Sequence, residues 1–157
     1  MSTLENQLIE ASKNGDLDKV KHLVKNGADI HTQDDYVLIW SATYGHLDVV
    51  KYLVENGANI HTQDDYALRW SAGYGYLDVV KYLVENGADI HAQDNYALRW
   101  SAKYNYLEVV KYLVENGADQ KVLFKIWDKQ QIVKVFREID DCNYNRQHTD
   151  ELCSELF

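Results

Sequence analysis

Histidine is the first residue type in this chain to consider for metal binding or catalysis, because it recurs at regular intervals as His31, His61 and His91. Imidazole nitrogen is a common zinc ligand, but zinc requires its ligand nitrogens about 2 Å from the ion. Side chains at equivalent positions of successive repeat units lie roughly one stacking distance apart, which is too far for a shared ion. The spacing therefore favours a structural role for these histidines and predicts no metal site.

Cysteine offers a second candidate chemistry, since Cys142, Cys153 and His148 lie close together in the sequence. A nucleophilic thiol needs a base that is itself held by a third group, and this polar stretch shows no such framework. Two cysteines are also too few for a disulfide scaffold. No phosphate-binding glycine loop, H-E-x-x-H or G-x-S-x-G motif occurs. We therefore expect no enzyme and no cofactor.

Charge and hydropathy exclude further classes of function. The formal net charge is −9 with a pI near 5.0, whereas nucleic-acid binding depends on clustered Lys and Arg. No apolar run reaches the length of about 18 residues that a membrane span requires, and no charged-then-apolar leader follows Met1. The sequence predicts a soluble, intracellular, cytoplasmic protein that binds neither nucleic acid nor membrane.

An internal repeat positions these residues. Trp40, Trp70 and Trp100 stand 30 residues apart, and the sequence around them repeats almost unchanged. An earlier, degenerate copy carries polar substitutions that suit a terminal unit with one face in water. We predict a capping repeat at 1–33, full repeats at 34–63, 64–93 and 94–120, capping helices at 121–139 and an acidic polar tail at 140–157.

Each full repeat contains two helical patterns. In the third unit, Leu77, Val80 and Leu83 fall on one face of a helix that ends at Gly87, where glycine takes the left-handed conformation cheaply. A shorter helix precedes it over residues 67–73, and we expect Asp64 or Asp65 to cap it. Each unit is therefore predicted to be helix, turn, helix, loop.

The stretch GHLDVVKYLVENGANI, residues 45–60, resembles the second helix and outer loop of an ankyrin repeat. The period is 30 rather than about 33, and residues 66–72 match the T-P-L-H-x-A signature mainly at Leu68. The near-identical, tyrosine-rich copies are also similar to ankyrin repeat proteins of large DNA viruses that infect amoebae, which would place the chain in host cytoplasm. The resemblance implies an all-α ankyrin-repeat solenoid with shortened hairpin loops and a capping repeat at each end.

Ankyrin repeats imply a non-enzymatic scaffold or adaptor that binds a protein partner through its concave groove, acting more readily as a monomer than as an oligomer. The alternative is a structural repeat protein whose exposed aromatic faces drive self-association. The resemblance also assigns the recurring histidines to the family's outer loop, where such a residue bonds to backbone and links one loop to the next.

Candidate binding residues follow from the variable positions of the family's first helix. Tyr44, Tyr74 and Tyr104 match positions that face the groove, and tyrosine offers broad contact area with few rotatable bonds. Stacking of these tyrosines on one another is an equally good explanation. The same reasoning adds Thr43, Lys103, Asp35, Asp65, Asn95, Arg69 and Arg99.

Two assignments leave an alternative open, and the charge of the groove adds a prediction about the partner. Arg69 and Arg99 either pair with carboxylates such as Asp65 and Asp94, which we favour, or point at a partner. The tryptophans fit packing between units better than they fit binding hot spots. Aspartates at the edge of the groove would make it acidic, which favours a basic partner.

Overall fold

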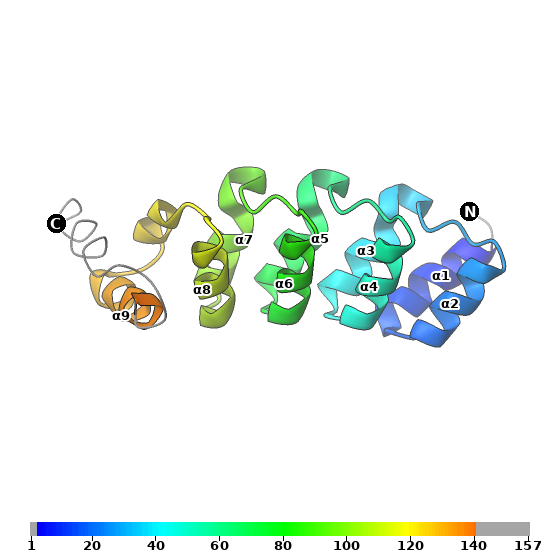
Figure 1. Ribbon diagram of the computed structural model, residues 1–157, viewed down its shortest axis with the longest axis horizontal. Helices are drawn as coiled ribbons and strands as arrows, with labels where there is room; N and C mark the ends of the chain where they lie inside the picture. Colours follow the sequence, from blue (N-terminus) through cyan, green and yellow to red (C-terminus); the bar gives the residue numbers. More distant parts are fainter. Residues whose placement is uncertain (1–2, 141–157) are drawn as a thin grey trace.

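Helices stacked in pairs make up the whole of the described chain. The computed structural model describes residues 3–140, which contain no strand, so the all-α prediction is confirmed. In Figure 1 the pairs succeed one another from the N-terminal end to the C-terminal end along the long axis. The elements are α1 (Thr3–Asn14), α2 (Leu17–Lys25), α3 (Thr32–Thr43), α4 (Leu47–Glu55), α5 (Thr62–Gly73), α6 (Leu77–Glu85), α7 (Ala92–Lys103), α8 (Leu107–Glu115), the 3-10 helix η1 (Gln120–Lys125) and α9 (Lys129–Asp140).

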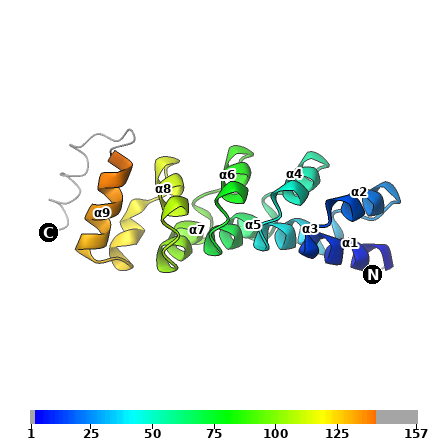
Figure 2. The same cartoon turned by 90° about the horizontal axis from the view of Figure 1, so that it is seen from below.

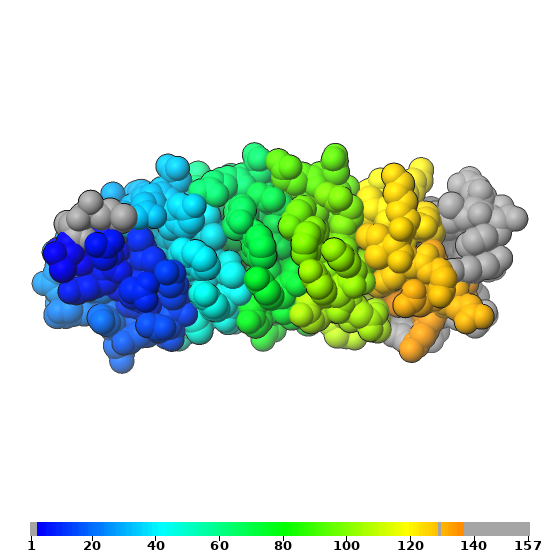
Figure 3. Space-filling model, turned by 180° about the vertical axis from the view of Figure 1, so that it is seen from behind, coloured from blue at the N-terminus to red at the C-terminus, as the bar shows by residue number. Residues whose placement is uncertain are grey.

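The helices form two rows, which Figure 2 shows as α1, α3, α5 and α7 in one row and α2, α4, α6 and α8 in the other. The first helix of each pair packs against the first helices of its neighbours, and its leucine, such as Leu68 or Leu98, is fully buried. The space-filling view shows successive units as adjoining slices of one elongated body (Figure 3). The core is therefore a line of inter-unit contacts, as repeat arrays require.

The loops that enter the first helices are left-handed. In α5, Gln63, Asp64 and Asp65 all have φ between 51° and 56°, and the equivalent residues of α3 and α7 do the same. The regular right-handed part of α5 therefore begins at Tyr66, the residue after Asp65. The prediction that Asp64 or Asp65 caps this helix is wrong, because no side chain caps α5. The left-handed turn directs the carboxylate of Asp65 to the next unit, where it accepts a hydrogen bond from the N–H of Asp89 at 2.9 Å.

Left-handed backbone costs roughly 1 to 2 kcal/mol per non-glycine residue, so this loop needs compensation. Arg69 supplies part of it: its Nε donates to the carbonyl of Asp64 at 2.9 Å, and its Nη2 donates to the carbonyl of Gln63 at 2.7 Å. Gln93 of the next unit adds a bond to the Asp64 carboxylate at 2.7 Å. Side chains from two units therefore hold the strained loop of α5.

The C-terminal end closes the array with a different element. Here η1 replaces the first helix of a further unit, and α9 packs against α8. Trp127 between them is buried and donates its Nε1–H to the carbonyl of Ala102 at 3.0 Å. Leu123 and Phe136 are also buried. This segment therefore covers the apolar side of the fourth unit.

None of the helices between residues 3 and 140 is both long enough and apolar enough to cross a membrane. The acidic tail predicted at 140–157 lies, except for its first residue, outside the described part of the chain.

Candidate functional site

Each full unit places a tryptophan and a tyrosine on one face of its first helix. Their spacing of four residues brings the rings together one helical turn apart. The centroids lie 5.8 Å apart in Trp40–Tyr44, 5.5 Å apart in the third unit and 5.4 Å apart in the fourth. We call this surface the aromatic face; its members are Trp40, Tyr44, Trp70, Tyr74, Trp100 and Tyr104.

The tyrosines of the aromatic face are its exposed part. Tyr44, Tyr74 and Tyr104 expose 48%, 47% and 50% of their surface, which is unusual for so large an apolar ring. Each contacts aromatic rings of its own unit, for example Tyr74 with Tyr76 at 6.4 Å. Among the described residues no ring contact joins the three tyrosines to one another. Stacking along the array therefore does not account for their exposure.

The tryptophans contribute to packing between units and are also partly exposed. They are only partly buried, and Trp70 and Trp100 pack across the unit boundary with their centroids 6.5 Å apart. Trp70 also contacts Tyr66 at 5.5 Å. They therefore support neighbouring units and at the same time form the base of the aromatic face.

A cavity of about 220 Å³ opens in the aromatic face between α5 and α7. Gly73 lies in its wall, where the other two full units carry Thr43 and Lys103. A Cβ at Gly73 would lie 3.7 Å from the Cβ of Trp100, an ordinary contact, so glycine leaves the space open without being required by the backbone. We call this cavity the Gly73 pocket; it is lined by Arg69, Trp70, Gly73, Tyr74, Tyr96, Trp100, Tyr104 and Tyr106.

Sequence reasoning missed the Gly73 pocket. The available signal was the single glycine at a position where the sister units carry larger side chains, but a missing side chain marks a cavity only if the neighbours leave the space empty. Thr43, also a candidate binding residue, is half-buried and donates its hydroxyl to the carbonyl of Ile39 at 2.8 Å.

The arginines do not form the ion pairs that we favoured. The guanidinium of Arg69 lies between the rings of Tyr66, at 4.8 Å, and Tyr96, at 5.2 Å, and its hydrogen bonds go to backbone carbonyls. Arg99 donates to the carbonyl of Gln93 at 3.0 Å. The left-handed loops expose these carbonyls, so they take the donors that we assigned to carboxylates.

Tyr96 gives this cluster a pH dependence. Burial raises the pKa of Tyr96 above its ordinary value of 10.0, although the nearby guanidiniums of Arg69 and Arg99 lower it in part. The unfolded chain therefore ionises this tyrosine first, and its contribution to stability is intact below pH 10 and is lost as the pH rises through the raised pKa. We expect the urea midpoint of the wild type to fall more steeply above pH 10 than that of Tyr96→Phe. Parallel pH profiles would contradict this assignment.

Asp35 and Asp65 are buried under the loops, whereas Asn95 is half-buried and also lines the hollow between α7 and η1. Asp35 and Asp65 are 5% and 4% exposed. Their carboxylates accept from the backbone N–H groups of Asn59, at 3.1 Å, and Asp89, at 2.9 Å, in the following unit. Asn95 accepts from the N–H of Asp119 at 3.0 Å in the same way. These side chains therefore join successive units.

The histidines support these junctions from within their own loops. The Nδ1 atoms of His31, His61 and His91 lie 3.0 to 3.1 Å from the side-chain oxygens of Asp35, Asp65 and Asn95, four residues later. The expectation that histidine itself links one loop to the next is therefore wrong. Histidine orients the carboxylate or amide that makes the link.

The aromatic face is basic where we expected an acidic groove. In the right-handed segments 36–43, 66–73 and 96–103 the charged side chains are Arg69, Arg99 and Lys103. The expectation of a basic partner depended on Asp35 and Asp65, which are buried. Lys103 places its Nζ 4.7 Å from the centroid of the Trp100 ring. These right-handed segments therefore differ in the sign of their charge from the whole chain, while the exposed aspartates Asp34, Asp64 and Asp94 lie in the loops that precede them.

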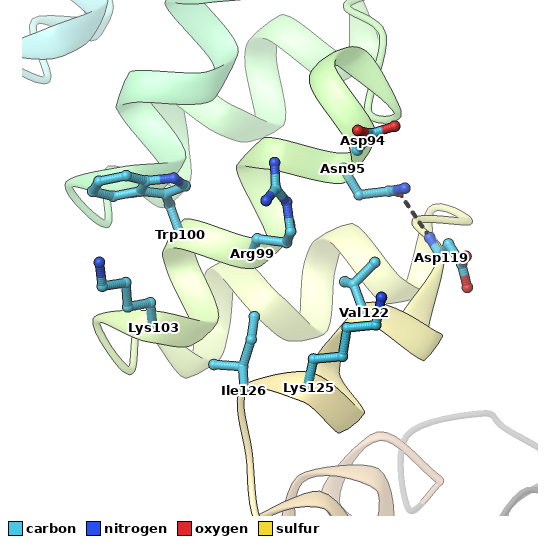
Figure 4. A pocket seen from close by; sticks show the side chains of 9 residues that line it. All are labelled: Asp94, Asn95, Arg99, Trp100, Lys103, Asp119, Val122, Lys125 and Ile126. Carbon is cyan, nitrogen blue, oxygen red and sulfur yellow. Dashed lines mark hydrogen bonds between the residues drawn. The ribbon is translucent and has the colours of Figure 1, made fainter.

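A second, larger hollow lies on the other side of α7, against η1 (Figure 4). Its volume is about 730 Å³, and its wall includes Arg99, Trp100, Lys103 and Lys125. The next unit carries Ile126 where the repeat would place a tyrosine. Arg99 is consequently covered on one side by Tyr96, at 5.7 Å, and faces the hollow on the other. We call this space the Arg99 hollow.

Within residues 3–140 no group of three or more His, Cys, Asp or Glu side chains is arranged to hold a metal ion. Cys142, Cys153 and His148, the candidate nucleophiles and base, lie outside the described residues.

The stacked helix pairs and their inter-unit core define a helical-repeat solenoid. Comparison with known families is specific: the profile for three ankyrin repeats matches residues 8–94, and a profile for one more ankyrin repeat matches residues 94–123. The chain therefore belongs to the ankyrin repeat family, as the sequence resemblance predicted. No curated protein matched the sequence.

Proposed function

We propose that this chain is a non-enzymatic adaptor that binds a segment of a partner protein along the aromatic face. Ankyrin repeats are in general protein–protein interaction modules. The observation that carries the proposal is the row of half-exposed tyrosines on rigid helices. Tyrosine and tryptophan dominate binding energy at protein interfaces because they bury large areas at low entropic cost.

The proposal extends to the setting in which the adaptor acts. We take it to work as a monomer in the cytoplasm, since two cysteines in 157 residues suit a reducing compartment. A mass that rises with concentration in light scattering would instead support the alternative of a self-associating structural protein.

The test removes the exposed rings and leaves the scaffold in place. A triple variant with alanine at Tyr44, Tyr74 and Tyr104 is expected to lose the partner that the wild type retains in an affinity pull-down. The half-exposed rings contribute little to the core, so the helical circular dichroism signal is expected to remain.

A matched control places alanine at Glu55, Glu85 and Glu115, which recur with the same spacing and are exposed in the other row of helices. This control is expected to keep the partner. A partner that both triple variants retain would place the binding surface elsewhere.

A further inference from the structure

The Gly73 pocket has the size and lining of a receptor for a single apolar side chain. Its volume of about 220 Å³ is bounded largely by aromatic rings, and no acidic side chain lines it. Arg69 lies in the wall, and Lys103 adds a second positive charge beside Trp100. An aromatic cage for a cation needs carboxylates or neutral walls, so these charges disfavour a lysine or arginine as occupant.

The Arg99 hollow supplies positive charge immediately beyond Trp100, which lines both cavities. Arg69 has tyrosine rings on both sides and two hydrogen-bonded nitrogens, whereas Arg99 has one ring and one bonded nitrogen. The Nε of Arg99 is buried and has no hydrogen-bond partner among the described residues. The guanidinium is therefore incompletely satisfied beside an open space.

The acidic side chains of the Arg99 hollow lie at its far end. Figure 4 shows Asp94 and Asp119 on the side away from Lys103. Asp119 is engaged, because its Oδ1 accepts from the N–H of Lys121 at 3.0 Å and caps η1. The end nearer to Trp100 therefore presents Arg99 and Lys103 to an incoming anion, whereas Lys125 lies beside Val122 on the side toward Asp119.

We propose that the partner is an acidic segment of another protein that inserts one apolar side chain, such as Phe or Leu, into the Gly73 pocket. An Asp or Glu close to this anchor then pairs with Arg99 or Lys103. The inference depends on the proposed function and specifies the chemistry of its partner. A second copy of the chain is disfavoured because two whole chains with a net charge of −9 each repel one another, whereas a short acidic segment brings its charge only to the basic residues that it contacts.

The experiment selects binders from a displayed library of random peptides with the purified wild-type protein as bait. The enriched peptides are expected to share an apolar residue next to Asp or Glu. Their binding to the wild type is then measured by fluorescence polarisation, and it is expected to weaken with added salt, since exposed charge pairs are screened.

Two matched pairs of variants separate the contribution of the apolar side chain to binding from that of the basic residues. Gly73→Leu fills the pocket and is expected to raise Kd at least about tenfold, whereas Thr43→Leu, at the equivalent position of α3, leaves Kd within about twofold. Lys103→Glu is expected to raise Kd about tenfold, and Lys13→Glu, beside Trp40 at the far end of the face, to change it little. Circular dichroism verifies that all four variants are folded.

The outcomes that overturn the inference are distinct from those that overturn the proposed function. Enrichment of Lys- or Arg-rich peptides would overturn the acidic partner. Peptides that tolerate Gly73→Leu but are lost with the triple tyrosine variant would overturn the anchor and leave the adaptor function standing. Self-association of the protein that Gly73→Leu abolishes would make a second copy the occupant. Failure to enrich any peptide would count against both proposals.

Discussion

Asp65→Ala is expected to lower the free energy of unfolding by about 3 kcal/mol, a large effect for one side chain in a repeat protein. The carboxylate of Asp65 is buried and accepts from the backbone N–H of Asp89 at 2.9 Å, while the Nδ1 of His61 lies 3.1 Å away. Alanine leaves that N–H without its partner and must keep φ at 56°, a left-handed conformation that aspartate tolerates better than alanine does. Urea denaturation followed by circular dichroism measures the change.

The chain itself provides the control for this prediction. Asn95 occupies the same left-handed position in the fourth unit and accepts from the N–H of Asp119 at 3.0 Å. Asp65→Asn keeps the accepting oxygen and is therefore expected to cost less than about 1 kcal/mol. Equal losses for the alanine and asparagine variants would show that charge, rather than the bond to the next unit, makes Asp65 stabilising.

Trp70→Ala is expected to cost about 3 kcal/mol, at the lower end of the range for removing a large aromatic side chain, because the indole is only partly buried. The ring packs against Tyr66, Tyr74 and Trp100, so its loss weakens the boundary between the third and fourth units. It also removes one wall of the Gly73 pocket. Urea denaturation is expected to show lower stability, and binding of the selected peptides is expected to be lost under conditions in which the variant remains folded.

Trp40→Ala is the matched control for Trp70→Ala. Trp40 contacts one ring, that of Tyr44 at 5.8 Å, and lies outside the pocket. We expect a smaller loss of stability and retained peptide binding. A double-mutant cycle between Trp70 and Trp100 is expected to give a coupling energy of about 0.5 to 1.5 kcal/mol. A coupling energy near zero would contradict the role of these rings in joining units.

The repeat and its helices could be predicted from the sequence because they depend on local rules. Recurrence of tryptophan every 30 residues indicated the unit, and the apolar spacing of Leu77, Val80 and Leu83 predicted a helix that the structure places at Leu77–Glu85. Glycine at the helix ends and the similarity of residues 45–60 to an ankyrin repeat identified the family. Each of these signals is visible in the order of residues along the chain and does not depend on which residues meet in space.

Hydrogen bonds between distant residues could not be predicted in the same way. The partner of Asp65 is the N–H of Asp89, 24 residues later, and the partners of Arg69 are carbonyls exposed by a left-handed loop. Sequence patterns show that a carboxylate and a guanidinium are present, but not which backbone groups the fold leaves without partners. We therefore assigned capping to Asp65 and ion pairing to Arg69, and both assignments were wrong.

The sequence by itself thus determined a solenoid of ankyrin repeats with aromatic residues at regular positions, because periodicity and helix signals are local. Only the tertiary structure decided which charged residues lie beside those aromatic rings and where a pocket opens between them. Stacking of the units buried Asp35 and Asp65 in the junctions, left Arg69, Arg99 and Lys103 as the charges beside the rings, and opened a pocket at Gly73. Burial and exposure depend on the neighbouring unit, so an acidic chain presents a basic aromatic face.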